Sequence, residues 1–290
     1  MDFYEQKKAR GRHRDKNYNS KYPKKQKQKQ KNHEQNQNAE IYLETQEYFK
    51  KFSLSKTKFP ECFRAPIEDD FELLEAESSA KVRVVNGDTL DTAFEYCFGS
   101  LENSILVLNM ASMYKPGGGV LRGRTAQEEN IFRRTNAFMT HPSTWYPLAD
   151  NEIIYSPEIR VVRDSSYKFL KDKEYDISMI AVPSIKNPQV YVNSEACECF
   201  RNASDKELVA QKIESIFKIA ILKEKKVLIL GALGCGAYNG PVHEIAKIFR
   251  KYVKKYRKYF IAIDFAVLNQ GRNGQRNFEV FQETILQEEE

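Results

Sequence analysis

The sequence predicts a three-layer α/β/α fold, in which helices cover both faces of one central sheet. From residue 81 onward, short apolar runs of strand length alternate with segments of helical periodicity. Glycine-rich loops follow two of these runs, at residues 115–119 and 231–240. Because ligands of open α/β sheets bind beyond the carboxyl ends of the strands, the two loops predict a binding site at that edge.

The expected strands are apolar and rich in β-branched residues, and the expected helices place their apolar residues three and four positions apart. We expect strands at residues 81–85, 104–111, 176–184, 226–230 and 259–268, and a strand pair at 152–155 and 158–164. We expect helices at residues 90–98, from 125 to about 138, from Ser204, where Ser-Asp-Lys-Glu has the spacing of a capping box, and from Pro241 to about 257.

The chain divides into a basic arm, an extension and a body. Residues 1–38 hold twelve Lys and Arg against four Asp and Glu, so this arm accounts for the whole net charge of +6. The arm offers almost nothing to bury, which predicts disorder, with weak nucleic-acid or polyanion contact as likely a role as solubility alone. Residues 39–80 should form a helical extension packed on the body, irregular after residue 53, and residues 81–290 the body itself.

Other features of the composition exclude several classes of site. The five cysteines and four histidines show no disulfide or metal-ligand spacing, so we expect no disulfide framework, no metal and no cofactor. No apolar span approaches the roughly eighteen residues of a membrane helix, and the N-terminus lacks the apolar core of a secretory signal. We therefore expect an intracellular location in cytoplasm or nucleus, no membrane partner, and a monomer.

The first stretch with chemical character joins a strand to a helix. The apolar run ends near Asn109, Lys115-Pro-Gly-Gly-Gly119 follows, and Thr125-Ala-Gln-Glu128 has the spacing of a capping box. This order places Glu128 and Glu129 in the first helical turn, beside a loop whose backbone can approach a ligand closely. The stretch therefore favours a site with anion binding and proton transfer, over a surface turn with solvated glutamates.

The second stretch has the layout of a phosphate site. A buried strand leads into residues 231–240, with glycines at 231, 234, 236 and 240, and Pro241 then opens a helix. Glycines in such a loop let backbone N–H groups turn inward on a diphosphate. Cys235 lies within it, but no histidine motif supports a nucleophile, so we expect the cysteine to serve only as a small residue in the turn.

These motifs carry a resemblance to a known family. Gly117 to Gly119 followed by Gln127-Glu-Glu129 resembles the signature of the microbial-type poly(ADP-ribose) glycohydrolases, a branch of the macrodomain superfamily. Gly234-Cys-Gly-Ala-Tyr238 is similar to the macrodomain diphosphate loop. The resemblance covers roughly residues 40–285. It implies a mixed central sheet and a poly(ADP-ribose) glycohydrolase that cleaves the ribose–ribose O-glycosidic bond to release ADP-ribose. The partner it implies is poly(ADP-ribose) or ADP-ribosylated protein.

The resemblance also implies roles for individual residues. Glu129 would act as general acid and then base, while Glu128 and Asn109 bind the distal ribose. Adjacent residues on a helix point about 100° apart, which also argues against two carboxylates straddling one bond. Asp88 would accept from the adenine amino group, although capping the following helix explains an Asp there equally well. The other substrate-binding residues implied are Gly117, Gly118, Gly119, Gln127, Gly234, Cys235, Gly236, Ala237, Tyr238, Phe265 and Asn269.

Two other functions fit the same loops. A non-catalytic ADP-ribose-binding macrodomain would keep the glycine loops, and a mono-ADP-ribosyl hydrolase would act on protein or nucleic acid. Many binders lack paired glutamates, so Gln127-Glu-Glu129 favours an enzyme. One tension remains, because a helix N-terminus favours the carboxylate form whereas a general acid must be protonated.

Overall fold

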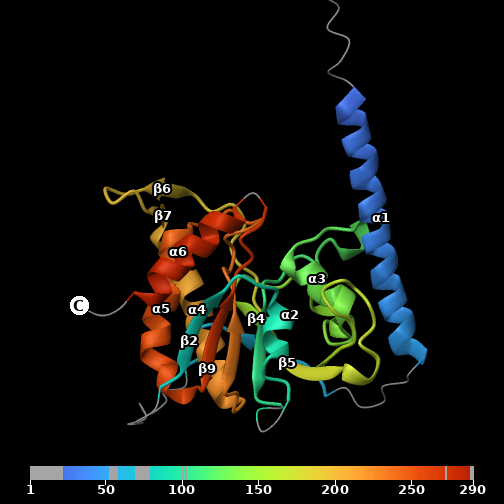
Figure 1. Ribbon diagram of the computed structural model, residues 1–290. Coiled ribbons are helices and arrows are strands. Elements are labelled where there is room, and N and C mark those ends of the chain that lie inside the picture. Colours follow the sequence, from blue (N-terminus) through green and yellow to red (C-terminus); the bar gives the residue numbers. More distant parts are fainter. Residues whose placement is uncertain are drawn as a thin grey trace, which may run out of the picture.

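The structure is a computed structural model that describes residues 22–51, 58–68, 79–98, 101, 103–271 and 273–287. A seven-stranded sheet forms its centre, with helices on both faces (Figure 1). The helices are α1 (Tyr22–Lys51), α2 (Thr89–Phe94), α3 (Gln127–Arg134), α4 (Ala203–Leu222), α5 (Val242–Tyr256) and α6 (Gly274–Leu286). The strands are β1 (Glu61–Arg64), β2 (Lys81–Val85), β3 (Ile105–Asn109), β4 (Glu152–Val161), β5 (Tyr175–Ala181), β6 (Val190–Val192), β7 (Glu198–Phe200), β8 (Val227–Leu230) and β9 (Ala262–Ala266).

The sheet is mixed, as expected. Its order is β1-β4-β5-β3-β8-β9-β2, with β6 and β7 forming a separate hairpin. The strands from β5 to β2 are parallel to their neighbours, whereas β4 and β1 are antiparallel additions at one edge. Because β3 and β8 are parallel neighbours, their carboxyl ends lie at the same edge. This pairing brings the two glycine loops to one side of the molecule.

Side chains of the central strands alternate between two apolar layers, which confirms the three-layer architecture. Leu106 and Leu108 of β3 pack in the layer that contains α4, α5 and α6. Ile105 and Val107 face the opposite layer, which contains residues of α1, α2 and α3. Figure 1 shows the two groups of helices on opposite sides of the sheet. All five residues of β3 are buried, so the end of this strand is a rigid support for the site.

The N-terminal part differs from the prediction. Helix α1 begins at Tyr22, so residues 22–38 of the expected disordered arm are helical, and that expectation is wrong for them. Lys, Gln and Glu have good helix propensity, and the second half of the helix packs on the body. The expectation for residues 1–21 lies outside the described residues. Residues 61–64, expected to be irregular, form β1 at the sheet edge, while the division into functional domains stays a prediction.

Three further corrections concern local signals. Residues 152–161 form one strand instead of a strand pair, because β4 pairs with β5 on both sides of an irregularity between Ser156 and Ile159. Pro157 falls inside that irregularity, where a missing N–H is tolerated. Helix α4 begins before the predicted capping box and shows no side-chain cap. Helix α6 and the β6–β7 hairpin were not predicted.

Candidate active site

Gln127 fastens the start of α3 to the end of β3. Its side-chain oxygen accepts from the Met110 amide at 2.8 Å, and its nitrogen donates to the Leu108 carbonyl at 2.6 Å and to Thr89 Oγ1 at 3.2 Å. The amide that was expected to bind substrate is therefore engaged with the protein. Its effect is to fix the next two residues of the helix at the carboxyl edge of the sheet.

Glu128 and Glu129 turn toward the glycine loop. Glu128 accepts from the Ser112 amide at 2.8 Å through Oε2 and from the Gly117 amide at 3.2 Å through Oε1. Glu129 Oε1 accepts from the Gly119 amide at 2.7 Å. The predicted capping box does not form, because Ala126 is the N-cap residue and no side chain caps α3. Backbone amides of the segment between β3 and α3 bind both carboxylates instead.

The glycine loop fits closely against α3. Gly117 and Gly118 have left-handed backbone conformations, with φ of 66° and 51°. A Cβ atom on Gly118 would lie 2.8 Å from both Glu128 Oε2 and Glu129 Oε1, so this glycine lies between the two carboxylates. The Gly118 amide donates to the Lys115 carbonyl at 3.2 Å. All three loop amides are thus used within the protein, and the loop orients the glutamates.

The two carboxylates share a buried environment. Glu128 is 3% exposed and Glu129 is 7% exposed. Burial raises the pKa of Glu128 to about 8, with a further rise from the charge of Glu129, against the lowering effect of the Ser112 and Gly117 amides. At Glu128, burial therefore outweighs the hydrogen bonds that favour the carboxylate. As a result, Glu128 retains its proton near neutral pH.

Several buried polar atoms beside the pair have no hydrogen-bond partner among the described residues. They are the two side-chain amide atoms of Asn109, Glu129 Oε2 and the Tyr146 hydroxyl. Asn109 is the last residue of β3 and is fully buried. Buried polar groups are normally paired, so such a set marks where polar groups of a ligand can bind.

Tyr146 was missed by the sequence analysis. Burial and the charge of Glu128 both raise the pKa of its hydroxyl, which places the ring near that carboxylate. The Leu148 amide donates to the Met113 carbonyl at 2.8 Å and so holds this segment beside the loop that follows β3. No local motif marks Tyr146, because its position comes from pairing between segments distant in the sequence.

The second glycine loop lies next to the first. Burial raises the pKa of the Tyr238 hydroxyl, and the Ser112 side chain and Met113 backbone oppose that rise, which places Tyr238 beside the segment that leads into the first loop. Gly234 has φ of 76°, and a Cβ atom there would lie 2.3 Å from Ser184 Oγ. Gly236 and Ala237 are exposed at the tip. Cys235 is buried, and burial raises the pKa of its thiol, which agrees with a role in the turn and not as a nucleophile.

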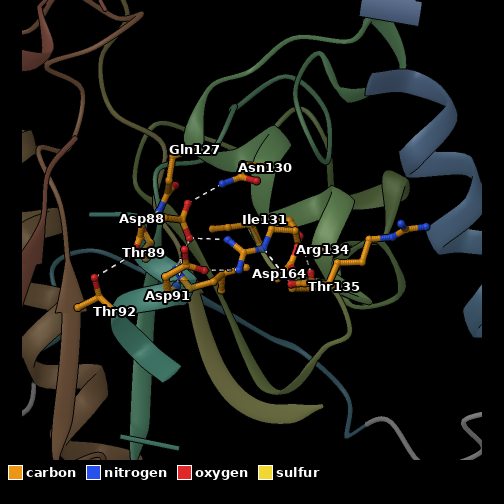
Figure 2. Close-up of polar contacts among 12 residues, drawn as sticks. Asp88, Thr89, Asp91, Thr92, Gln127, Asn130, Ile131, Arg134, Thr135 and Asp164 are labelled. Carbon is orange, nitrogen blue, oxygen red and sulfur yellow. Dashed lines mark hydrogen bonds and ion pairs between the residues drawn. The ribbon is translucent and has the colours of Figure 1, made fainter. Parts of the chain in front are cut away.

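Asp88 caps α2 and is held from α3. Its Oδ1 atom accepts from the amides of Leu90 at 2.8 Å and Asp91 at 3.2 Å. Arg134, which is 1% exposed, donates to the same oxygen at 2.5 Å, and Asn130 donates to Oδ2 at 2.5 Å (Figure 2). The capping alternative is therefore observed, and contact with adenine stays a prediction.

The two residues expected to flank the adenine differ in exposure. Phe265 is fully buried between Phe249 and Phe281, with ring centroids 5.3 and 5.7 Å away. It belongs to the core and does not line the site, so that expectation is wrong. Asn269 is exposed, and its amide donates to Asn86 Oδ1 at 3.1 Å at the exits of β9 and β2.

Fold and site together define a class of protein. A buried carboxylate pair stands beside unpaired polar atoms at the carboxyl edge of an α/β/α sheet, and a glycine loop of phosphate-site layout adjoins it. This arrangement is that of a hydrolase acting on a phosphorylated glycoside. Among the described residues, no group of three or more His, Cys, Asp or Glu side chains could hold a metal ion. In the same part of the chain, no helix is long and apolar enough to cross a membrane.

The family follows from comparison with known proteins. The family described as microbial-type PARG, catalytic domain, matches residues 6–164, which is more than half of the chain. The chain therefore belongs to the microbial-type poly(ADP-ribose) glycohydrolases, which are glycoside hydrolases. The matched range contains both glutamates, whereas the second glycine loop lies beyond it. A comparison with curated proteins gave no match.

Solved structures of bacterial enzymes share the fold. The poly(ADP-ribose) glycohydrolase of Thermomonospora curvata is 18% identical, with a TM-score of 0.65 over 86% of this chain and 99% of that one. The Deinococcus radiodurans enzyme in complex with ADP-ribose is 22% identical, with a TM-score of 0.60 over 71% of this chain and 84% of that one. The T. curvata enzyme bound to the inhibitor ADP-HPD is 20% identical, with a TM-score of 0.63 over 84% and 98%.

Proposed function

We propose that Glu129 is the general acid and base with which this poly(ADP-ribose) glycohydrolase cleaves the ribose–ribose bond, and that Glu128 and Asn109 bind the distal ribose. One observation carries the assignment. Both oxygens of Glu128 and Oε1 of Glu129 accept backbone N–H groups, whereas Glu129 Oε2 is buried without a partner among the described residues. Glu129 therefore has a free oxygen to meet the glycosidic oxygen.

The chemistry then proceeds in two proton transfers. Glu129 delivers a proton to the glycosidic oxygen, and the bond from that oxygen to the anomeric carbon breaks. The distal ribose becomes oxocarbenium-like, and the released polymer end carries the new hydroxyl. Water then attacks the anomeric carbon and gives its proton to the Glu129 carboxylate, which regenerates the acid. Glu128 and Asn109 hold ribose hydroxyls throughout.

The rest of the ligand would extend along the carboxyl edge of the sheet. In this proposal the loop from Gly234 to Tyr238 holds the diphosphate, and Asp88 and Asn269 lie at the adenine end. The ADP-ribose complex of the D. radiodurans enzyme and the ADP-HPD complex of the T. curvata enzyme support this class of ligand. Weak polyanion contact through the basic residues 1–38, a monomeric state and an intracellular location stay predictions from the sequence.

The test compares two conservative variants. Glu129→Gln should keep ADP-ribose affinity within about threefold while polymer hydrolysis falls about 10²- to 10⁴-fold, because the amide cannot transfer the proton. Glu128→Gln should lose both affinity and rate, since it would bind ribose. Calorimetry with ADP-ribose and product analysis on polymer and mono-modified protein measure both effects.

Three outcomes would contradict the proposal. A dead Glu128→Gln enzyme beside an active Glu129→Gln enzyme would reverse the two roles. Binding without turnover by the unmodified chain would indicate a reader of ADP-ribose. Turnover confined to mono-modified substrates would indicate a mono-ADP-ribosyl hydrolase.

A further inference from the structure

We propose that Arg133 is a positioning residue for Glu129, through which helix α1 fixes the catalytic glycine loop. The inference rests on the role proposed for Glu129. It concerns the face of α3 that points away from the strands, where α1 runs beside α3 (Figure 1).

Arg133 connects α3 to α1. Its side chain is fully buried, its Nε donates to the Asn38 carbonyl at 2.8 Å, and its own carbonyl accepts from Thr45 Oγ1 at 2.7 Å. No described carboxylate forms an ion pair with it, and the Tyr167 ring centroid lies 5.9 Å from the guanidinium carbon. Burial of such a cation is costly, and an apolar residue would pack there at less cost. Its hydrogen bonds to backbone carbonyls offset part of this cost.

The Nη2 atom of the Arg133 guanidinium contacts the segment that follows the glycine loop. Nη2 donates to the Arg124 carbonyl. The Arg124 amide donates to the Gly119 carbonyl at 3.2 Å, and its side chain covers Gly119, where an added Cβ would lie 2.4 Å from Arg124 Cγ. The Gly119 amide is the donor to Glu129 Oε1. Contacts therefore run without a gap from Asn38 through Arg133 to the catalytic carboxylate.

Helix α1 also touches the loop directly. The loop turns through the short helix η1 (Val120–Arg122) and ends at Gly123, which has φ of 65°. A Cβ atom on Gly123 would lie 1.9 Å from the Gln35 carbonyl oxygen, so the two backbones are in contact. The Asn38 side chain donates to the Gly123 carbonyl at 3.5 Å. A displacement of α1 would therefore move the loop from two directions.

The consequence for catalysis follows from the single bond that holds Glu129. If the Gly119 amide shifts, Oε1 loses its donor and the free Oε2 changes direction. Misplacement of a catalytic group by about 1 Å can lower the rate roughly 10²-fold.

Glu128 loses at most its contact with Gly117, because the Ser112 amide that binds its Oε2 lies outside residues 117–124. Asn109 lies in β3, and the second glycine loop does not depend on this contact, so ground-state binding of ADP-ribose should change less than the rate.

Arg163 provides a matched control. It is also buried under α1, donating to Thr45 Oγ1 at 2.9 Å and to Glu44 at 3.0 Å. It forms no described contact with the loop at residues 117–124. Arg133→Met and Arg163→Met thus each remove a buried arginine that holds α1, but only the first removes a contact with the loop.

The experiment measures kcat, ADP-ribose Kd, thermal midpoint and hydrogen exchange in Arg133 and Arg163 variants of the full chain. We expect Arg133→Met to lower kcat for polymer hydrolysis at least tenfold, with ADP-ribose Kd within about threefold, and Arg133→Lys to restore part of the loss. Arg163→Met should lower the thermal midpoint comparably but keep kcat within about threefold. Hydrogen exchange at residues 117–124 should accelerate in Arg133→Met alone.

The outcomes separate this inference from the proposed function. Equal kcat and equal exchange in the two arginine variants would overturn it. If the unmodified chain fails to cleave polymer, the proposed function falls, and the exchange comparison still decides whether Arg133 holds the loop. If Arg133→Met fails to fold, Gly123→Ala is the second variant, because its added Cβ would collide with the Gln35 carbonyl and separate α1 from the loop. Unchanged kcat and exchange in Gly123→Ala would contradict the inference.

Discussion

At the residue scale, Glu128 and Glu129 differ through their contacts and not through their identity. The loop amides occupy both oxygens of Glu128, whereas Glu129 keeps one buried oxygen free. Burial also raises the pKa of Glu128 to about 8, well above that of a free glutamate. Neighbouring residues of one helical turn can thus divide binding and proton transfer between them.

The raised pKa predicts a pH dependence of stability. Between about pH 4.5 and pH 8, folded Glu128 holds a proton that the unfolded chain has lost, so the free energy of unfolding falls as pH rises. His141 has the opposite sign, because burial lowers its pKa to about 4, so its contribution to stability increases as pH rises through about 6.5. Between pH 6.5 and 8, Lys212, whose pKa burial lowers to about 8, and His243, whose pKa burial also lowers, change protonation on folding as well. The contribution of Glu128 is therefore obtained by comparison with a Glu128 variant.

In that window, Glu128→Gln should flatten the decline, which for one group is at most about 1.4 kcal/mol per pH unit. Denaturant unfolding of both proteins at pH 6.5, 7.2 and 8 measures the difference. Parallel stability curves for the two proteins would show that Glu128 ionises normally.

At the element scale, the two glycine loops serve different purposes. In the loop before α3, backbone amides donate hydrogen bonds to Glu128 and Glu129. In the loop after β8, Gly236 and Ala237 are exposed. Backbone strain also differs within the second loop. Gly234 has left-handed φ and a close neighbour, while an added Cβ on Gly236 would meet nothing within 4 Å.

This difference predicts two distinct phenotypes. Gly234→Ala should lower the free energy of unfolding by about 1–3 kcal/mol, through strain and collision with Ser184. Gly236→Val should change stability little yet weaken ADP-ribose binding at least tenfold, since its side chain would enter the place proposed for the diphosphate. Calorimetry and chemical unfolding of both variants test this, and undiminished affinity in Gly236→Val would move the diphosphate elsewhere.

At the scale of the whole molecule, the N-terminal helix is part of the folded body. Asn38 and Thr45 hold the buried Arg133 and Arg163, and Tyr42 and Phe49 are buried in the described structure. Removal of residues 1–38 would take away the first half of α1, including Gln35 and Asn38 against the loop.

Two truncations test the importance of that contact. Deleting residues 1–38 should lower the thermal midpoint by several degrees, because α1 loses its contacts with Gly123 and Arg133. Deleting residues 1–27 should change it by less than about 2 °C, since those contacts remain, while weakening polymer binding at low salt through loss of positive charge. Equal midpoints for the two truncated proteins would show that the Gln35–Asn38 contacts are dispensable.

The sequence by itself determined the central strands, the two glycine loops and the placement of Glu128 and Glu129 at the start of a helix. These features depend on local signals: apolar runs such as residues 105–109 and 227–230 are bounded by glycine and proline, and their backbone preferences do not need distant partners.

Tertiary structure decided the remainder, because it depends on contacts between distant segments. The capping box at Thr125 does not form, because backbone amides bind the side chains of Glu128 and Glu129. Phe265 packs in the core against α5 and α6. Contacts between distant segments also decide three other features. They are the helical state of residues 22–38, the single strand β4, and the unpaired atoms of Asn109, Glu129 and Tyr146. Local propensity is a weak preference, and packing overrides it wherever a distant partner offers more.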